Sequence, residues 1–164
     1  MVGKIAFNSI GIIFTAYKLP RGTPIQSAAA RDKEGLIVLD KQYIDCLKDL
    51  IHFSHCIILY YFHKVKSGWD PQVKPFLDTV SRGLFATRAP RRPNPIGISI
   101  VKLLSIQDNE IRFSGVDILD ETPLLDIKPY IPIFDCVLVE KTRIGWLEGK
   151  IDLLNQMKDD GRFS

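Results

Sequence analysis

A proline-locked, arginine-rich stretch constrains this chain more than any other part of the sequence. From Arg82 to Leu103 it reads RGLFATRAPRRPNPIGISIVKL, with prolines at positions 90, 93 and 95. Proline fixes φ, lacks an amide hydrogen and disfavours helical backbone in the residue before it. Residues 88–95 therefore cannot form a helix, and we expect an extended, stiff loop. Such a loop loses little entropy when an anion or nucleotide binds, although a structural turn with solvated arginines explains these residues equally well.

The rest of the composition is that of an ordinary globular chain. At 164 residues, with 46% hydrophobic and 25% charged residues, it is long enough for one domain with a sizeable core. The net charge of +3 permits a local patch for RNA or phosphate without arguing for one.

The cysteines and the apolar runs indicate the cellular compartment of the protein. Cys46, Cys56 and Cys136 lie far apart and form no C-x-x-C pair, a pattern typical of reduced thiols and not of a disulfide framework or a zinc site. No run approaches the roughly 18 consecutive apolar residues of a membrane span. We therefore expect a soluble, cytoplasmic protein with neither a metal ion nor a membrane partner.

Strand-forming patterns outnumber helical ones. β-Branched and aromatic runs predict strands at residues 4–17, 35–39, 55–64, 96–106 and 111–116. Helical spacing predicts a helix after Asp40, which can cap it, and a C-terminal amphipathic helix from Gly145 onward. No regular β–α alternation is present. The chain is therefore predicted to be mainly β: a compact antiparallel barrel with a few short helices over residues 1–140, followed by a helix and tail over 141–164.

Two histidines flank the predicted central strand. His55 and His63 have the same parity and would project from one face of a straight strand. Eight steps separate them by roughly 26 Å, so they cannot share a metal ion. Each is expected to hydrogen-bond locally at a strand end, although His55 could equally face a ligand.

The predicted hairpin brings two charged segments together. It joins the basic loop 88–95 to an acidic segment, 117–126, which contains Asp117, Asp120, Glu121 and Asp126. The flanks of a hairpin meet at one end of its sheet. The acids could hold a divalent metal, or, more commonly, pair with the arginines. Opposed charges at one end of a barrel suit a zwitterionic or cationic small molecule lying against an anionic polymer.

Several runs resemble one known family. GLFATRAPRRPNPIGISIVKL, followed by GVDILDETPLLDIKPYIPIFD, is similar to the TsaA-like domain of the TrmO family of tRNA methyltransferases. IGIIFTAYK, PIQ at 24–26 and FSHCIILYYFH at 53–63 agree with it. The resemblance covers roughly residues 8–140, nearly the whole predicted barrel, and its central motif is long and specific.

The resemblance carries expectations about fold and activity. It implies a β-barrel that binds S-adenosylmethionine in a homodimer, with the cofactor near the subunit interface. It also implies methylation of the 6-amino nitrogen of threonylcarbamoyladenosine beside the tRNA anticodon. The alternatives are a cofactor- or RNA-binding module without catalysis, and methyl transfer to another acceptor.

The resemblance also assigns residues by motif. The implied cofactor pocket comprises Pro24, Ile25, Gln26, His55, Cys56, Arg88, Ile98, Ile118, Leu119, Asp120 and Glu121. Ile25 stands where the family often has arginine, and Glu121 where it usually has glycine. A sulfonium cofactor with an amino acid tail suits carboxylates and a bidentate arginine.

Methylating a urea-like nitrogen calls for a group that removes its proton. We expect Asp120 or Asp126 to accept it, with Tyr130 or Asn94 orienting the base. An ion pair between Asp126 and Lys128 that braces two loops is an alternative role for Asp126. The cationic side chains expected to contact tRNA phosphates are Arg91, Arg92, Lys18 and Arg21.

Overall fold

The computed structural model describes residues 3–137, 141–154 and 156–163. Its strands are β1 (Gly11–Phe14), β2 (Glu34–Leu39), β3 (His55–Tyr61), β4 (Gln72–Val73), β5 (Arg82–Gly83), β6 (Ile96–Gln107), β7 (Glu110–Ser114) and β8 (Thr122–Pro129). One short α-helix, α1, spans Pro132–Asp135. Short 3-10 helices occupy Ser27–Ala29, Lys41–Leu47, Leu50–His52, Leu84–Ala86, Gly145–Leu147 and Ile151–Leu153.

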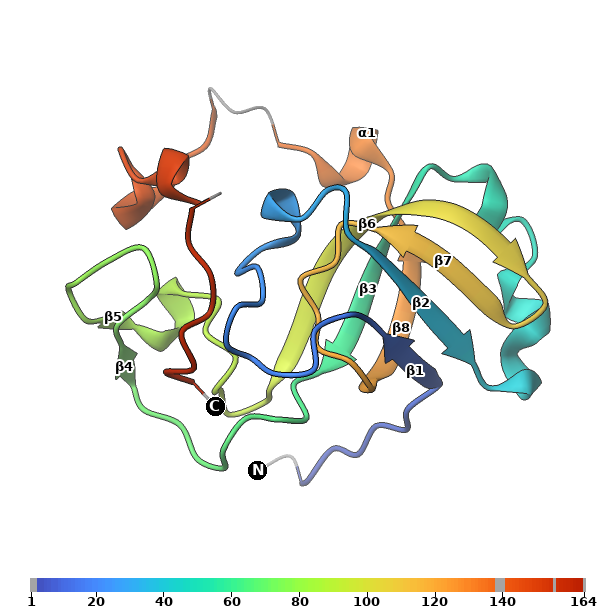
Figure 1. Cartoon of the computed structure of the whole chain (residues 1–164), viewed down its shortest axis with the longest axis horizontal. Helices are drawn as coiled ribbons and strands as arrows, with labels where there is room; N and C mark the ends of the chain where they lie inside the picture. The colour runs from blue at the N-terminus through green and yellow to red at the C-terminus, as the bar shows by residue number, and fades with distance from the viewer. Residues whose placement is uncertain (1–2, 138–140, 155, 164) are drawn as a thin grey trace.

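Six strands close into an antiparallel barrel (Figure 1). Their order is β1-β2-β7-β6-β3-β8, and β8 pairs back onto β1. The long strand β6 alternates exposed and buried residues, because successive side chains point to opposite faces of a strand. The interior is filled by large side chains such as Phe113, Ile13 and Leu124, all fully buried. The predicted antiparallel β-barrel is confirmed.

The central hairpin is also confirmed. β6 and β7 pair antiparallel up to Gln107 and Glu110, and the turn between them places Asp108 at φ 51°. Beyond β7 the chain runs back along β6, so that the Ser99 hydroxyl donates a hydrogen bond to the Asp117 carboxylate at 2.7 Å. The acidic segment therefore does return to the end of β6 that carries the arginine loop.

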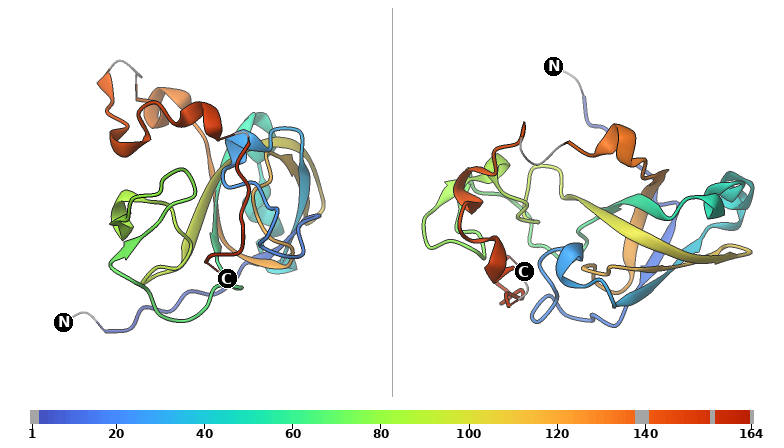
Figure 2. Two further views of the ribbon diagram at one scale, coloured as in Figure 1. Left: turned by 60° about the vertical axis from the view of Figure 1, so that its left-hand side comes forward. Right: turned by 90° about the horizontal axis from the view of Figure 1, so that it is seen from above.

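A smaller lobe lies beside the barrel (Figures 1 and 2). It contains the two-stranded sheet of β4 and β5 together with the C-terminal segment, which we define as residues 145–154 and 156–163. Leu84, Ala89 and Phe163 form a second small core there, with Val73 and Phe76 packed against it. The end of the chain is thereby fixed onto the loop that carries Arg88.

Three predicted elements differ from the structure. The N-terminal strand is confined to β1, because only four residues pair with β2. The helix after Asp40 is two 3-10 helices interrupted at Asp49, whose φ is 66°, and Asp40 makes no side-chain cap. The C-terminal helix is two 3-10 helices, because Gly149 between them adopts a left-handed φ of 71°.

The predicted boundary between residues 140 and 141 borders 138–140, which lie outside the described residues. In the part of the chain that the structure describes, no helix is both long and apolar enough to span a membrane.

Candidate functional site

A cavity of about 710 Å³ opens where the barrel meets the smaller lobe. Pockets of this size commonly take small organic ligands. Its walls come from the loop before β2, the end of β3, the arginine loop, the start of β6, the segment before β8 and the C-terminal segment. Most of these parts are far apart in sequence, so the cavity depends on the whole fold.

The arginine loop is held by its own side chains. Arg92 Nη1 donates to the backbone oxygens of Thr87 at 3.0 Å and Ala89 at 3.2 Å, and its guanidinium lies over the Phe85 ring. The Thr87 hydroxyl donates to Leu84 O at 2.8 Å. The loop is therefore non-helical and braced, as its prolines predict.

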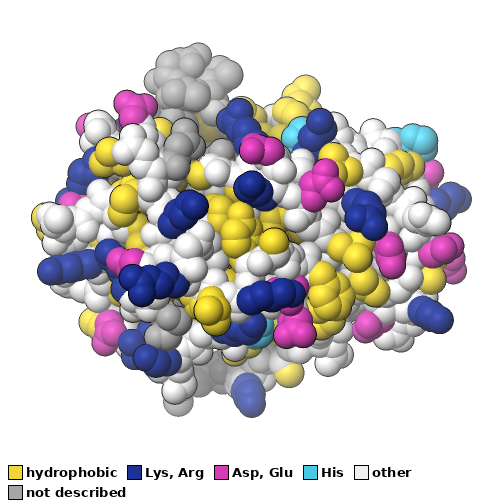
Figure 3. All heavy atoms as spheres, viewed as in Figure 1, with side chains coloured by type: hydrophobic (Ala, Val, Ile, Leu, Met, Phe, Trp, Pro, Cys, Tyr) yellow, Lys and Arg dark blue, Asp and Glu magenta, His cyan; other side chains and the backbone are white. Residues whose placement is uncertain are grey.

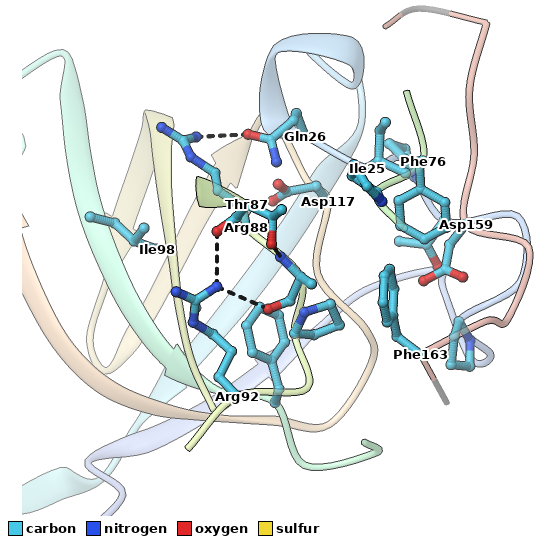
Figure 4. A pocket seen from close by; sticks show the side chains of 18 of the residues that line it. Ile25, Gln26, Phe76, Thr87, Arg88, Arg92, Ile98, Asp117, Asp159 and Phe163 are labelled. Carbon is cyan, nitrogen blue, oxygen red and sulfur yellow. Dashed lines mark hydrogen bonds between the residues drawn. The ribbon is translucent and has the colours of Figure 1, made fainter. Parts of the chain in front are cut away.

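This bracing presents Arg88 to the cavity. Arg88 Nη1 donates to Gln26 Oε1 at 2.7 Å, across 62 positions of sequence (Figure 4). Both side chains line the cavity, so a guanidinium with further free donors is oriented by a neutral amide.

Asp117 supplies the opposite charge. Ser99 Oγ donates to Asp117 Oδ1 at 2.7 Å and lies 3.1 Å from the Tyr60 hydroxyl, so Tyr60 donates to Ser99. Loss of solvation raises the pKa of Asp117 to about 6, although Ser99 and the Arg88 charge act against this rise. At neutral pH the cavity thus holds an ionised carboxylate that is poorly solvated and fixed by a hydroxyl chain.

Tyr60 reaches this chain because Gly97 lies opposite it. A Cβ at Gly97 would stand 2.2 Å from Tyr60 Cε2, far inside van der Waals contact. The glycine in the PIGIS run therefore makes room for the ring that ends the hydroxyl chain.

His63 adds a neutral acceptor. The Thr122 hydroxyl donates to Leu119 O at 2.7 Å, so it can accept from His63 Nδ1, which lies 3.3 Å away. Burial and the neighbouring Lys64 lower the pKa of His63. His63 lines the cavity, and its Nε2 is buried without a hydrogen-bond partner among the described residues.

The structure brings most of the predicted cofactor residues together. Those that line the cavity are Pro24, Ile25, Gln26, Arg88, Ile98, Ile118 and Leu119. His55 and Cys56 lie elsewhere, at the start of β3, whereas the cavity meets β3 at its end. His55 Nδ1 lies 2.9 Å from Ser54 Oγ, and burial inside the barrel raises the pKa of the Cys56 thiol to about 11.

Asp120 is engaged elsewhere. It is buried, forms an ion pair with Lys18 and accepts a hydrogen bond from Thr15 N–H at 2.9 Å. Burial would raise its pKa, but these donors hold the pKa below the ordinary value. Neither Asp120 nor Glu121 lines the cavity, and Glu121 adopts a left-handed φ of 62°. This conformation explains why glycine suits that position.

The other predicted catalytic residues also lie away from the cavity. Asp126 pairs with Lys128 at 2.6 Å. Since both belong to β8, the pair does not brace two loops. Tyr130 packs edge-on against His55, and Asn94 is exposed in the proline loop.

Among the described contacts of this acidic segment, Asp120 and Asp126 pair with lysines. Asp117 accepts a hydrogen bond from Ser99 and also feels the charge of Arg88. In the ranges that the structure describes, no three His, Cys, Asp or Glu side chains are grouped to hold a metal ion.

The cations predicted to bind RNA have mixed environments. Arg92 braces its own loop, as described above. Arg91 lies 3.6 Å from Asp70 and donates to Gly68 O at 3.3 Å. Lys18 pairs with Asp120 but remains largely exposed, and Arg21 is exposed.

Sequence reasoning missed two groups of cavity residues. Asp117 and His63 stand within the runs GVDILDE and YYFHK, but strand parity alone does not show that they turn into one space. The C-terminal residues that line the cavity were expected to form a separate helix and tail, and their local pattern gives no indication of the contact.

Comparison with known proteins identifies the domain. The model of the tRNA-methyltransferase O N-terminal domain matches residues 12–136. A probable S-adenosyl-L-methionine-binding protein of Pyrococcus abyssi (strain GE5 / Orsay) is 48% identical over 159 residues, covering 97% of this chain and 85% of that protein. The tRNA (adenine(37)-N6)-methyltransferase of Escherichia coli (strain K12) is 38% identical over 140 residues, covering 80% of this chain and 60% of the enzyme.

A solved structure agrees with the family match and with these relatives. The crystal structure of TrmO from Pseudomonas aeruginosa matches with a TM-score of 0.71 at 32% identity, covering 88% of this chain and 63% of that one. This chain thus spans less than two thirds of the length of that structure and of the E. coli enzyme. From the family match and from relatives more than 30% identical, we conclude that the chain belongs to the tRNA-methyltransferase O N-terminal domain family.

Proposed function

We propose that this protein binds S-adenosylmethionine in the cavity and methylates the 6-amino nitrogen of threonylcarbamoyladenosine beside the tRNA anticodon. Membership of the family and the names of the relatives support this proposal. The observation that carries it is the convergence of Arg88, Gln26 and Asp117 in one cavity.

These residues fit the chemistry of the cofactor, which would supply a methyl group on a positively charged sulfur. The Arg88 guanidinium is suited to bind the carboxylate of the amino acid tail through two parallel hydrogen bonds. The Asp117 carboxylate is suited to stabilise a cationic centre nearby. Because both side chains are fixed by neighbours, little order is lost when the cofactor enters.

We assign proton acceptance to Asp117 in place of Asp120 or Asp126. A group that removes a proton must reach the reacting nitrogen, and of these three carboxylates Asp117 lines the cavity. The raised pKa, about 6, makes Asp117 a stronger base than an ordinary carboxylate while leaving it ionised at neutral pH. Ser99 and Tyr60 act as positioning residues that orient it. Activity should therefore rise with pH as Asp117 ionises near pH 6.

Calorimetric titration with S-adenosylmethionine tests the cofactor site. We expect micromolar-range affinity, about −8 kcal/mol, that falls at least tenfold in Arg88→Ala. Arg91→Ala is the matched control, because Arg91 lies in the same loop but pairs with Asp70 and does not line the cavity. No detectable binding by the natural protein would overturn the proposal, and equal losses in both variants would overturn the assignment of Arg88.

Methyl transfer tests the reaction. The protein should methylate a tRNA that carries threonylcarbamoyladenosine, and it should not methylate a tRNA that carries unmodified adenosine. Asp117→Asn should abolish transfer, whereas Asp126→Asn should retain it, because Asp126 pairs with Lys128 outside the cavity. Cofactor binding without transfer to any tRNA would instead favour a cofactor-binding module.

Cations near the cavity support the tRNA partner. Figure 3 shows an apolar patch framed by Lys and Arg side chains on one face of the molecule. We propose that exposed cations such as Arg21 and Lys18 contact phosphates, while Arg91 and Arg92 mainly hold the loop. Arg21→Gln should lower the salt dependence of tRNA binding by about one counterion. An unchanged salt dependence would exclude Arg21 from the interface.

We also propose a homodimer that covers the outer face of β6. Ile98 and Ile100 on this face are 56% and 45% exposed, and Ile98 also lines the cavity. A second copy seated there would cover apolar surface and close the cofactor site. Light scattering should show a dimer that Ile100→Asp converts to a monomer. A monomeric natural protein would refute this arrangement.

A further inference from the structure

The C-terminal segment (residues 145–154 and 156–163) builds one wall of the cavity although it lies outside the family match to residues 12–136. Its side chains that line the cavity are Trp146, Leu147, Ile151, Leu154, Asp159 and Phe163. Apart from Asp159 these are apolar or aromatic. The cavity therefore has a charged half around Arg88 and Asp117 and an apolar half against this segment (Figure 4).

Specific contacts hold the segment in this place. The Trp146 indole N–H donates to Ala86 O at 2.8 Å, and Lys150 pairs with Asp78 at 2.9 Å. Further along, Asp159 N–H donates to Thr23 O at 2.9 Å, and Gly22 N–H donates to Asp159 O at 2.7 Å. Asp159 is thus paired through its backbone with the loop that carries Pro24, Ile25 and Gln26.

The apolar half offers aromatic and aliphatic surface to a ligand. Phe76 and Phe163 pack edge to face with centroids 5.3 Å apart, and Ile25 and Leu154 add further apolar surface. The Asp159 carboxylate lies among them, with Oδ1 fixed by a hydrogen bond from Gly161 N–H at 2.6 Å. Burial raises the pKa of this carboxyl. A partly buried carboxylate is stabilised by a hydrogen-bond donor on a ligand.

We propose that the apolar half is a subsite for a 6-aminopurine ring whose amino group donates to Asp159. This inference rests on the proposed function, since both the methyl donor and the acceptor nucleoside contain such a ring. Apolar walls would cover the two faces of the purine, and Asp159 would distinguish it from purines without the amino group. The C-terminal segment then contributes recognition within the same chain.

Titrations with adenosine and with purine riboside, which lacks the 6-amino group, test the subsite. The full chain should prefer adenosine by at least about tenfold, the lower end of the contribution of a hydrogen bond to a charged group. Asp159→Ala should reduce this preference to less than about threefold. Asp152→Ala is the control, since Asp152 is exposed in the same segment and does not line the cavity. No preference in the natural protein, or an unchanged preference in Asp159→Ala, would overturn the proposal.

Tryptophan substitutions give a second test that does not depend on the carboxylate. Ile151 and Leu153 belong to one 3-10 helix and are 47% and 45% exposed, but only Ile151 of the two lines the cavity. Ile151→Trp should fill the apolar half and weaken adenosine at least tenfold, whereas Leu153→Trp should leave its affinity unchanged. Equal affinities in the two variants would contradict the placement of the ring.

Competition identifies which ring occupies the subsite. If it is the adenine of the cofactor, S-adenosylmethionine should displace adenosine, and Asp159→Ala should weaken the cofactor. If it is the acceptor base, adenosine should bind the protein saturated with S-adenosylhomocysteine, and Asp159→Ala should raise the KM for tRNA alone. Because adenosine carries no methyl group, its preferential binding can be measured even if methyl transfer fails.

Discussion

Replacing Asp117 with asparagine should stabilise the protein while removing its activity. A carboxyl whose pKa rises from 3.8 to about 6 on folding costs about 3 kcal/mol more to ionise in the folded than in the unfolded state. One side of Asp117 faces the cavity, where water enters, so 3 kcal/mol is an upper value. Asparagine keeps an oxygen that accepts from Ser99 and carries no charge, which removes this cost.

The pH dependence makes the test specific. Below about pH 3 the carboxyl is protonated in both states and costs nothing. The cost begins as pH rises through the unfolded pKa of 3.8, grows until about pH 6 and is constant above that. Urea denaturation at about pH 7.5 should therefore show Asp117→Asn to be about 1–3 kcal/mol more stable than the natural protein, and the gain should fall to about 0.5 kcal/mol or less near pH 4. No gain at pH 7.5, or an equal gain at both values, would refute the buried-charge argument.

Other substitutions test the surroundings of the site. Glu121→Gly should stabilise the fold by about 1 kcal/mol in thermal denaturation, because φ at this position is 62°; a loss would show that the glutamate side chain contributes more than its backbone costs. Gly97→Ala should destabilise the fold by about 1–3 kcal/mol or more, because its Cβ would lie 2.2 Å from the Tyr60 ring. Unchanged stability would contradict this packing. Asp120→Ala should lower the free energy of unfolding by about 1–3 kcal/mol, because it leaves Thr15 N–H unpaired. Calorimetry should nevertheless give an unchanged cofactor affinity. A tenfold loss of affinity would place Asp120 in the pocket.

Local patterns were sufficient for much of the barrel. The period-two runs and the turn before Glu110 predict β6 and β7, and the prolines predict the extended arginine loop. Residues 4–10 have the same strand-forming character as β1 but lie outside that strand, because the ladder with β2 begins at Gly11. Ile10 continues the pairing by only one step, with backbone hydrogen bonds to Leu124 and Asp40. The break at Gly149 depends on a left-handed turn that helical spacing does not reveal.

The sequence predicts which segments contribute to the site but not the role of each residue within them. The DILDE run was expected to reach a cofactor, yet which carboxylate stays available depends on Lys18, 102 positions away from Asp120. The same applies to the wall built by the C-terminal segment, since its contact with Ala86 spans 60 positions and its contact with Thr23 spans most of the chain. Non-local pairings of this kind have no signature in short-range periodicity.

The return of β8 onto β1 decides how copies of this protein can associate. In a closed ring of six strands every strand has a hydrogen-bonded neighbour on each side, so the barrel has no edge strand to which another strand can be added. The dimer proposed above would therefore use side chains that point outward from the barrel, such as the exposed isoleucines on β6. The hydrogen bonds that shape the barrel thus also protect it from edge-to-edge aggregation, and an interface between copies can change without altering the fold.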